Sequence, residues 1–221
     1  CLVTQDAKTY NEGLELDFLM EIVNKSKIKE IVIMLDCCYS GSVGNSNLLR
    51  NITTLKEGIS VLASSHYTQV SKDSPTGGVF TKIICDALNG GAADTIGLIT
   101  VASIYSFADK LLGAFDQRPI FKAYVSKMIP LRISKPMVPL ETLRKITNYF
   151  NFTAELYQLD PTYEPEAEPK GHKNEKIFSD LQKFNRASLL VPVGEEQMDF
   201  AAVNSKSCKL TALGCHYWKL V

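Results

Sequence analysis

Two adjacent thiols and a carboxylate follow an apolar run in the first quarter of the chain. The run is Ile31–Leu35, and Asp36, Cys37 and Cys38 come directly after it. Five apolar residues without a polar break are typical of a strand buried on both faces of a parallel sheet. In open α/β sheets, ligands bind beyond the carboxyl ends of the strands. The three side chains are therefore expected where such a sheet does its chemistry.

The two cysteines also have a purely structural interpretation. A free cysteine is most often a small buried hydrophobic residue. Three features favour chemistry instead. The thiols lie at the end of the apolar run and not within it, Asp36 would be costly to bury without a partner, and Gly41 allows the backbone to turn sharply just after them.

The segment Asp36–Gly41, with the sequence Asp-Cys-Cys-Tyr-Ser-Gly, resembles the nucleophile motif of the caspase-like cysteine peptidases, especially the metacaspase and bacterial branches. The resemblance implies that Cys38 is the nucleophile and that Cys37 occupies a variable position. It implies that Asp36 lines the substrate-binding pocket for an Arg or Lys side chain. An alternative role for Asp36 is to orient the catalytic loop by accepting backbone N–H bonds.

The resemblance extends in weaker form over residues 1–128, which are expected to form a caspase-like domain. It implies a three-layer α/β sandwich with a mostly parallel sheet. Periodicity and capping signals place the elements of this domain. In order, they are the end of a strand at 1–4, a helix at 14–23, strands at 31–35 and 59–65, a helix at 79–88, a helix capped by Thr100, and a last strand at 120–125.

Cysteine peptidase chemistry needs a base, because a free thiol with a pKa near ~8.5 is only slightly ionised at neutral pH. In the resembled family this base is a histidine one strand before the nucleophile strand. That element would precede Cys1. The three histidines of the chain are His66 on a loop, His172 in a linker and His216 near the end, and His66 is the weak candidate among them. We therefore expect the chain to be the carboxyl-terminal part of a larger peptidase, with the histidine on another segment of the same protein.

The second half of the chain changes in composition. Residues 129–173 are expected to form a linker, rich in Pro and Glu near 160–169. Residues 174–221 resemble a small winged-helix domain, with Asn174 capping a helix and two paired strands at 189–193 and 199–203. Three lysines in this region are opposed by three acidic residues, so a protein contact is favoured over DNA. The residues are Lys206, Lys209 and Lys219 against Glu195, Glu196 and Asp199.

Composition limits the remaining function classes. The 221 residues carry 24 basic and 24 acidic side chains, so net charge gives no general case for nucleic acid or an anionic membrane. The six cysteines lack the spacing of a zinc site, and no apolar run approaches the ~18 residues of a spanning helix. Cys85 and Cys208 are expected to be packed thiols. Without a signal-peptide pattern, a reduced cytoplasmic protein is expected, with no cofactor and no membrane partner; a calcium requirement stays open.

The resemblance implies a cysteine endopeptidase that cleaves after Arg or Lys. Its expected partners are a protein substrate, the histidine-bearing segment of the same protein, and a protein activator at the carboxyl-terminal domain. The resemblance also implies a role as an effector of bacterial immunity or cell death. The alternative is a catalytically inactive caspase-like scaffold or a regulatory protein-binding module. The loop after the thiols holds Arg50 and Lys56, either self-cleavage positions or ordinary surface residues.

Overall fold

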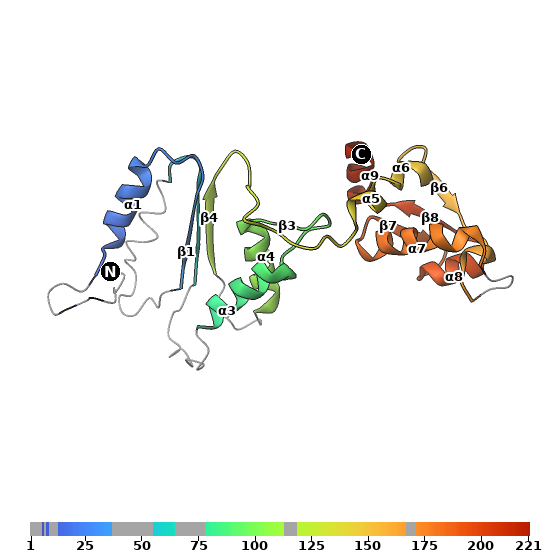
Figure 1. The fold of residues 1–221 in the computed structure, drawn as a ribbon, viewed down its shortest axis with the longest axis horizontal. Coiled ribbons are helices and arrows are strands. Elements are labelled where there is room, and N and C mark those ends of the chain that lie inside the picture. Colours follow the sequence, from blue (N-terminus) through green and yellow to red (C-terminus); the bar gives the residue numbers. More distant parts are fainter. Residues whose placement is uncertain are drawn as a thin grey trace. The chain divides into compact units, whose positions relative to one another are not determined.

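The computed structural model describes residues 6, 8, 13–36, 55–64, 78–112, 119–166 and 171–221 (Figure 1). The chain is mixed α/β and divides into two compact units. The first unit comprises residues 1–93 and 98–134, and the second comprises residues 94–97 and 135–221. The strand expected at 1–4 lies outside the described residues.

A sheet of β1 (Ile31–Leu35), β2 (Ile59–Ala63) and β4 (Ile120–Tyr124) forms the centre of the first unit, in the order β1-β2-β4. β1 and β2 pair in parallel, as the sequence predicts, and the structure places Leu35 opposite Ala63. β4 pairs with β2 antiparallel, so the expectation of a mostly parallel sheet is not confirmed for these strands. The prediction of complete burial fits β2, whose five residues are all buried, better than β1, where only Ile33 is buried.

Helices cover both faces of this sheet because the side chains of β2 alternate between them. On one face, Val61 packs in a cluster with Met20 and Val23 of α1 (Leu16–Lys25). On the other face, Leu62 packs with residues of α3 (Val79–Asp86) and α4 (Val101–Leu111). Figure 1 shows α1 on one side of the strands and α3 and α4 on the other. The helices at 14–23, 79–88 and after Thr100 are thus confirmed, with small shifts at their ends.

The N-terminus of α4 is capped as predicted. Thr100 Oγ1 accepts the Ser103 N–H at 3.1 Å, and Ser103 Oγ accepts the Thr100 N–H at 3.0 Å. This reciprocal pair satisfies two backbone donors that the helix leaves open. α3 continues into a π-helical turn, η2 (Ala87–Gly91), and a small antiparallel sheet joins β3 (Leu98–Ile99) to β5 (Arg132–Ile133).

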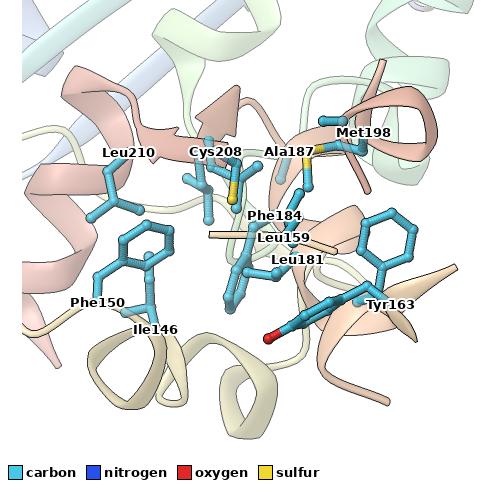
Figure 2. Close-up of a cluster of buried hydrophobic side chains, with 14 of the residues drawn as sticks. Ile146, Phe150, Leu159, Tyr163, Leu181, Phe184, Ala187, Met198, Cys208 and Leu210 are labelled. Carbon is cyan, nitrogen blue, oxygen red and sulfur yellow. The ribbon is translucent and has the colours of Figure 1, made fainter. Parts of the chain in front are cut away.

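The second unit has its own hydrophobic core and three-stranded antiparallel sheet, ordered β6-β8-β7. Figure 2 shows that this core gathers side chains from early and late parts of the unit's sequence, among them Phe150, Phe184 and Leu210. Its elements are α5 (Leu140–Leu143), α6 (Ile146–Tyr149), β6 (Leu156–Gln158), η3 (Pro161–Tyr163), α7 (Lys173–Arg186), β7 (Leu190–Val193), α8 (Met198–Val203), β8 (Ser207–Leu210) and α9 (Ala212–Leu220).

The linker predicted at 129–173 is wrong over most of its described length. Ile146, Phe150 and Tyr163 are buried in the core of the second unit, and the boundary between the units lies after residue 134. The proline-rich composition near 160 favours a linker, but Pro161 begins a helical turn that Asp160 caps. The Thr162 N–H donates to Asp160 Oδ1 at 2.9 Å. Proline suits the first position of a helical turn, where its missing N–H costs nothing.

The winged-helix expectation for 174–221 also needs correction. Residues 199–203 belong to the helix α8, not to a strand, and β7 pairs instead with β8. Met198, Ala201 and Ala202 are buried at helical spacing, which explains the preference for a helix. The helix expected to be capped by Asn174 is α7, whose N-cap is His172. Within the described ranges, none of the helices combines the length and apolar composition that crossing a bilayer needs.

Candidate functional site

The candidate site lies at the carboxyl ends of β1 and β2. Asp36 directly follows β1, and Ser64 directly follows β2. The Ser64 N–H donates to the carbonyl oxygen of Leu35 at 2.9 Å, which extends the parallel pairing to the last residue of β1. This bond fixes the backbone that leads into Asp36, so the carboxylate leaves the sheet at a defined point.

Asp36 binds the N-terminus of α3, 45 positions further along the chain. The Thr81 N–H donates to Asp36 Oδ2 at 3.1 Å, and the Thr81 hydroxyl donates to the same oxygen at 2.5 Å. Thr81 is the third residue of the helix, and the N-cap residue Gly78 has no side chain to satisfy its donors. Asp36 therefore acts as a remote cap, and its negative charge lies at the positive end of the helix dipole.

Gly78 is the residue that lets the carboxylate approach. A Cβ atom at this position would lie 2.5 Å from Asp36 Oδ2, far inside contact distance. The backbone angles of Gly78 are φ −66° and ψ 146°, which any residue can adopt. The requirement for glycine is thus steric and comes from Asp36.

Two roles are expected for Asp36, binding a basic side chain of the substrate and orienting the catalytic loop, and the structure bears on both. Its carboxylate accepts a backbone N–H, but the donor is Thr81 of α3 and not a residue of the loop that follows Asp36, so the orienting role stays a prediction. The Asp36 side chain is nevertheless exposed to solvent, so its charge is accessible to a cation. Cys37, Cys38 and the rest of the motif lie outside the described residues, so the structure does not place the predicted nucleophile.

The structure describes two of the three histidines, and they differ in their surroundings. His66, the weak candidate for the base, lies outside the described residues. His172 is the N-cap of α7, where its Nδ1 accepts the Asn174 N–H at 3.2 Å. His216 is exposed on α9, with its ring edge-on to Tyr217. Both described histidines belong to the second unit, and His172 has a structural task there.

The structure also describes Cys85, Cys208 and Lys56, on which the sequence analysis made predictions. Cys208 is buried as predicted, and burial raises the pKa of its thiol to about 12, which leaves it unreactive at neutral pH. Cys85 is exposed, so the prediction that it is packed is wrong. Lys56 Nζ donates to the Ser26 carbonyl oxygen at 2.9 Å. Across the described ranges, no three His, Cys, Asp or Glu side chains gather closely enough to hold a metal ion.

Sequence reasoning missed an ionic cluster around a buried carboxylate in the second unit. Asp180 is 5% exposed and accepts bonds from Lys145 Nζ at 2.8 Å, Tyr149 Oη at 3.0 Å and Lys183 Nζ at 3.0 Å. Burial acts to raise the pKa of Asp180, but the bonds from the two lysines and the tyrosine outweigh it, and the pKa lies below its ordinary value. Lys183 follows Asp180 by three residues on α7, a spacing that the sequence shows, whereas Lys145 is 35 positions away and only the fold brings it close.

We predict that Asp180→Asn lowers the stability of the second unit by about 2 kcal/mol at pH 7, the scale of a lost charged hydrogen bond. The pKa of Asp180 is lower in the folded state, so its contribution is complete above the unfolded pKa of ~3.9 and is lost as the pH falls through the folded pKa. Urea unfolding monitored by Trp218, the single tryptophan, measures this unit. A difference between wild type and variant that stays constant from pH 7 to pH 3 would contradict the prediction; Glu141→Gln, at an exposed acid, is the control.

Comparison with known proteins gives no family for this chain. Searches against protein-family models, curated proteins and solved structures found no match.

Proposed function

We propose that the chain is part of a caspase-like cysteine endopeptidase that cleaves peptide bonds after Arg or Lys, with Cys38 as nucleophile. The observation that carries the proposal is the position of Asp36 at the carboxyl end of β1, beside a parallel neighbour and at the N-terminus of α3. Cys38 follows Asp36 by two residues, so chain connectivity keeps their Cα atoms within ~7 Å. This proximity supports a nucleophile motif at the edge of the sheet where open α/β folds bind their ligands.

The proposed reaction has two covalent steps. The Cys38 thiolate attacks the carbonyl carbon of the scissile bond, and the Cys38 backbone N–H helps to hold the oxyanion; one such donor is worth ~10²–10³ in rate in other acyl-transfer enzymes. The histidine accepts the thiol proton and returns it to the leaving amine, which leaves a thioester on Cys38. Water then hydrolyses the thioester, with the histidine as base, and regenerates the thiol.

The histidine is proposed to come from a segment other than those described here. This is supported by the hydrogen bond of His172, whose Nδ1 already accepts a backbone N–H as a helix cap. The caspase-like three-layer sandwich belongs to the same proposal, supported by helices on both faces of the first-unit sheet.

Asp36 is proposed to bind the basic side chain on the amino-terminal side of the scissile bond. Its exposure and its negative charge support this role, and its bond to α3 holds the carboxylate in one place. A fixed carboxylate loses less side-chain entropy when it pairs with a cation, so preorganisation favours binding. An Asp-ended substrate would meet repulsion at the same position.

A biological role as an effector of bacterial immunity or cell death rests on the motif resemblance alone. The second unit is proposed to contact a protein activator, and its separate core supports an independent module. The alternative is an inactive scaffold or regulatory protein-binding module. Both described histidines, His172 and His216, belong to the second unit and not to the unit that holds Asp36, and this favours the alternative.

The test is a panel of fluorogenic peptides that differ only in the residue before the cut, incubated with the full-length protein. The proposal predicts cleavage after Arg and Lys at least about a hundredfold faster than after Asp, because an uncompensated charge at the pocket costs several kcal/mol. Cleavage only after Asp would refute the role of Asp36. No cleavage of any peptide would favour the scaffold.

A further inference from the structure

The two carboxylate oxygens of Asp36 are not equivalent. Oδ2 accepts two hydrogen bonds, one from the N–H and one from the hydroxyl of Thr81. A carboxylate oxygen offers two lone-pair sites. Thr81 therefore uses the whole accepting capacity of Oδ2. Oδ1 lies further from the helix, 3.6 Å from the position of a Cβ on Gly78, compared with 2.5 Å for Oδ2.

This inequality affects which cation the carboxylate can bind well. A guanidinium binds a carboxylate best as a fork, with one N–H donated to each oxygen. An ammonium is a point charge and needs only one accepting oxygen. With Oδ2 occupied by Thr81, the fork is not available, and both cations must pair through Oδ1.

We propose that Thr81 is a positioning residue that sets the selectivity of the site between Arg and Lys, with Gly78 as the residue that permits its contact with Asp36. The inference rests on the proposed function, in which Asp36 binds the basic side chain of the substrate. Thr81 removes the usual advantage of Arg over Lys at a carboxylate, so the site accepts both. Neither residue belongs to the nucleophile motif.

Gly78 offers an independent way to disturb the same contact. Its backbone angles suit alanine, so Gly78→Ala acts mainly through the new methyl group. That methyl group would lie 2.5 Å from Oδ2 and must displace the carboxylate from Thr81. Thr81→Val acts differently, because it keeps the size and the backbone N–H but removes the hydroxyl that donates to Oδ2.

The experiment compares kcat/KM of the full-length protein on two peptides that differ only in Arg or Lys before the cut. The wild type is expected to cleave both within about fivefold. Thr81→Val frees one lone pair of Oδ2, and we expect the Arg-to-Lys ratio to rise about tenfold, chiefly through KM for the Arg peptide, as one charged hydrogen bond provides. Thr81→Ser keeps the hydroxyl and should retain the wild-type ratio. Gly78→Ala should also change the ratio, because it separates Oδ2 from Thr81.

Three outcomes would overturn the inference, and they are distinguishable. If the wild type cleaves both peptides but Thr81→Val and Gly78→Ala leave the ratio unchanged, the inference fails and the proposed function stands. If both variants lose activity equally on the two peptides, Thr81 serves only the fold of α3, and the inference fails again. If the wild type cleaves neither peptide, the proposed function and the inference fall together.

Discussion

Replacing Cys38 by alanine should reduce peptide cleavage by more than about a thousandfold. The proposed reaction forms a covalent thioester on this sulfur, and loss of a nucleophile in other acyl-transfer enzymes removes nearly all of the catalytic rate. The measurement is kcat/KM on the Arg-ended peptide with the full-length protein. Thermal unfolding of the variant should match that of the wild type within about 1 kcal/mol, because the change removes one sulfur atom.

Cys37→Ala is the matched control for Cys38→Ala. It removes the same atom one position earlier, at the residue that the resemblance treats as variable. We expect it to keep activity within about threefold of the wild type. Equal loss in both variants, or loss only in Cys37→Ala, would place the nucleophile elsewhere.

The largest effect on stability is expected from Gly214→Ala in the second unit. A Cβ on Gly214, in the first turn of α9, would lie 1.9 Å from the Leu189 carbonyl oxygen. That oxygen cannot move freely, because it accepts the Thr211 N–H at 2.9 Å next to the start of β7. Either the helix shifts or this bond breaks. We expect a loss of about 3 kcal/mol or more, at the upper end of overpacking effects, measured by urea unfolding with Trp218 fluorescence.

Leu213→Ala tests the specificity of this effect, since it changes the neighbouring residue on the exposed side of α9. Its expected cost is below about 1 kcal/mol, as for surface substitutions away from special contacts. If Gly214→Ala proved no more costly than Leu213→Ala, the close approach of α9 to Leu189 would be wrong.

Sequence patterns were sufficient for elements with strong local signals. The apolar run Ile31–Leu35 and the run at 59–65 predicted β1, β2 and their parallel pairing. Thr100 predicted the start of α4 from its capping chemistry alone. The direction of β4 was not predictable in this way, because strand pairing depends on how distant segments return to the sheet and not on the residues of 120–124.

Composition misled where local and tertiary preferences differ. The acidic, proline-rich stretch near 160–169 has the composition of a linker, but Tyr163 is buried in the core and Pro161 starts a capped turn. Residues 199–203 alternate weakly and can be interpreted as a strand, whereas burial of Ala201 and Ala202 against the core favours a helix. A short apolar segment leaves helix and strand ambiguous until its packing partners are known.

At the candidate site, sequence reasoning placed Asp36 at the end of a strand and proposed that it could accept a backbone N–H. Thr81, the donor, was not identified, because a contact across 45 residues leaves no periodic signal. Gly78 offered a hint, since a glycine N-cap leaves its helix without a side-chain cap.

The most direct test of Cys38 as the nucleophile is to identify the residue that a substrate-like electrophile modifies. A peptide ending in Arg and carrying an acyloxymethyl ketone is incubated with the folded full-length protein, and the labelled residue is located by peptide mass mapping. We expect one label per chain, on Cys38, and we expect it to be lost when the protein is unfolded before labelling. A label on Cys37 or on the exposed Cys85, or labelling that survives unfolding, would contradict this expectation.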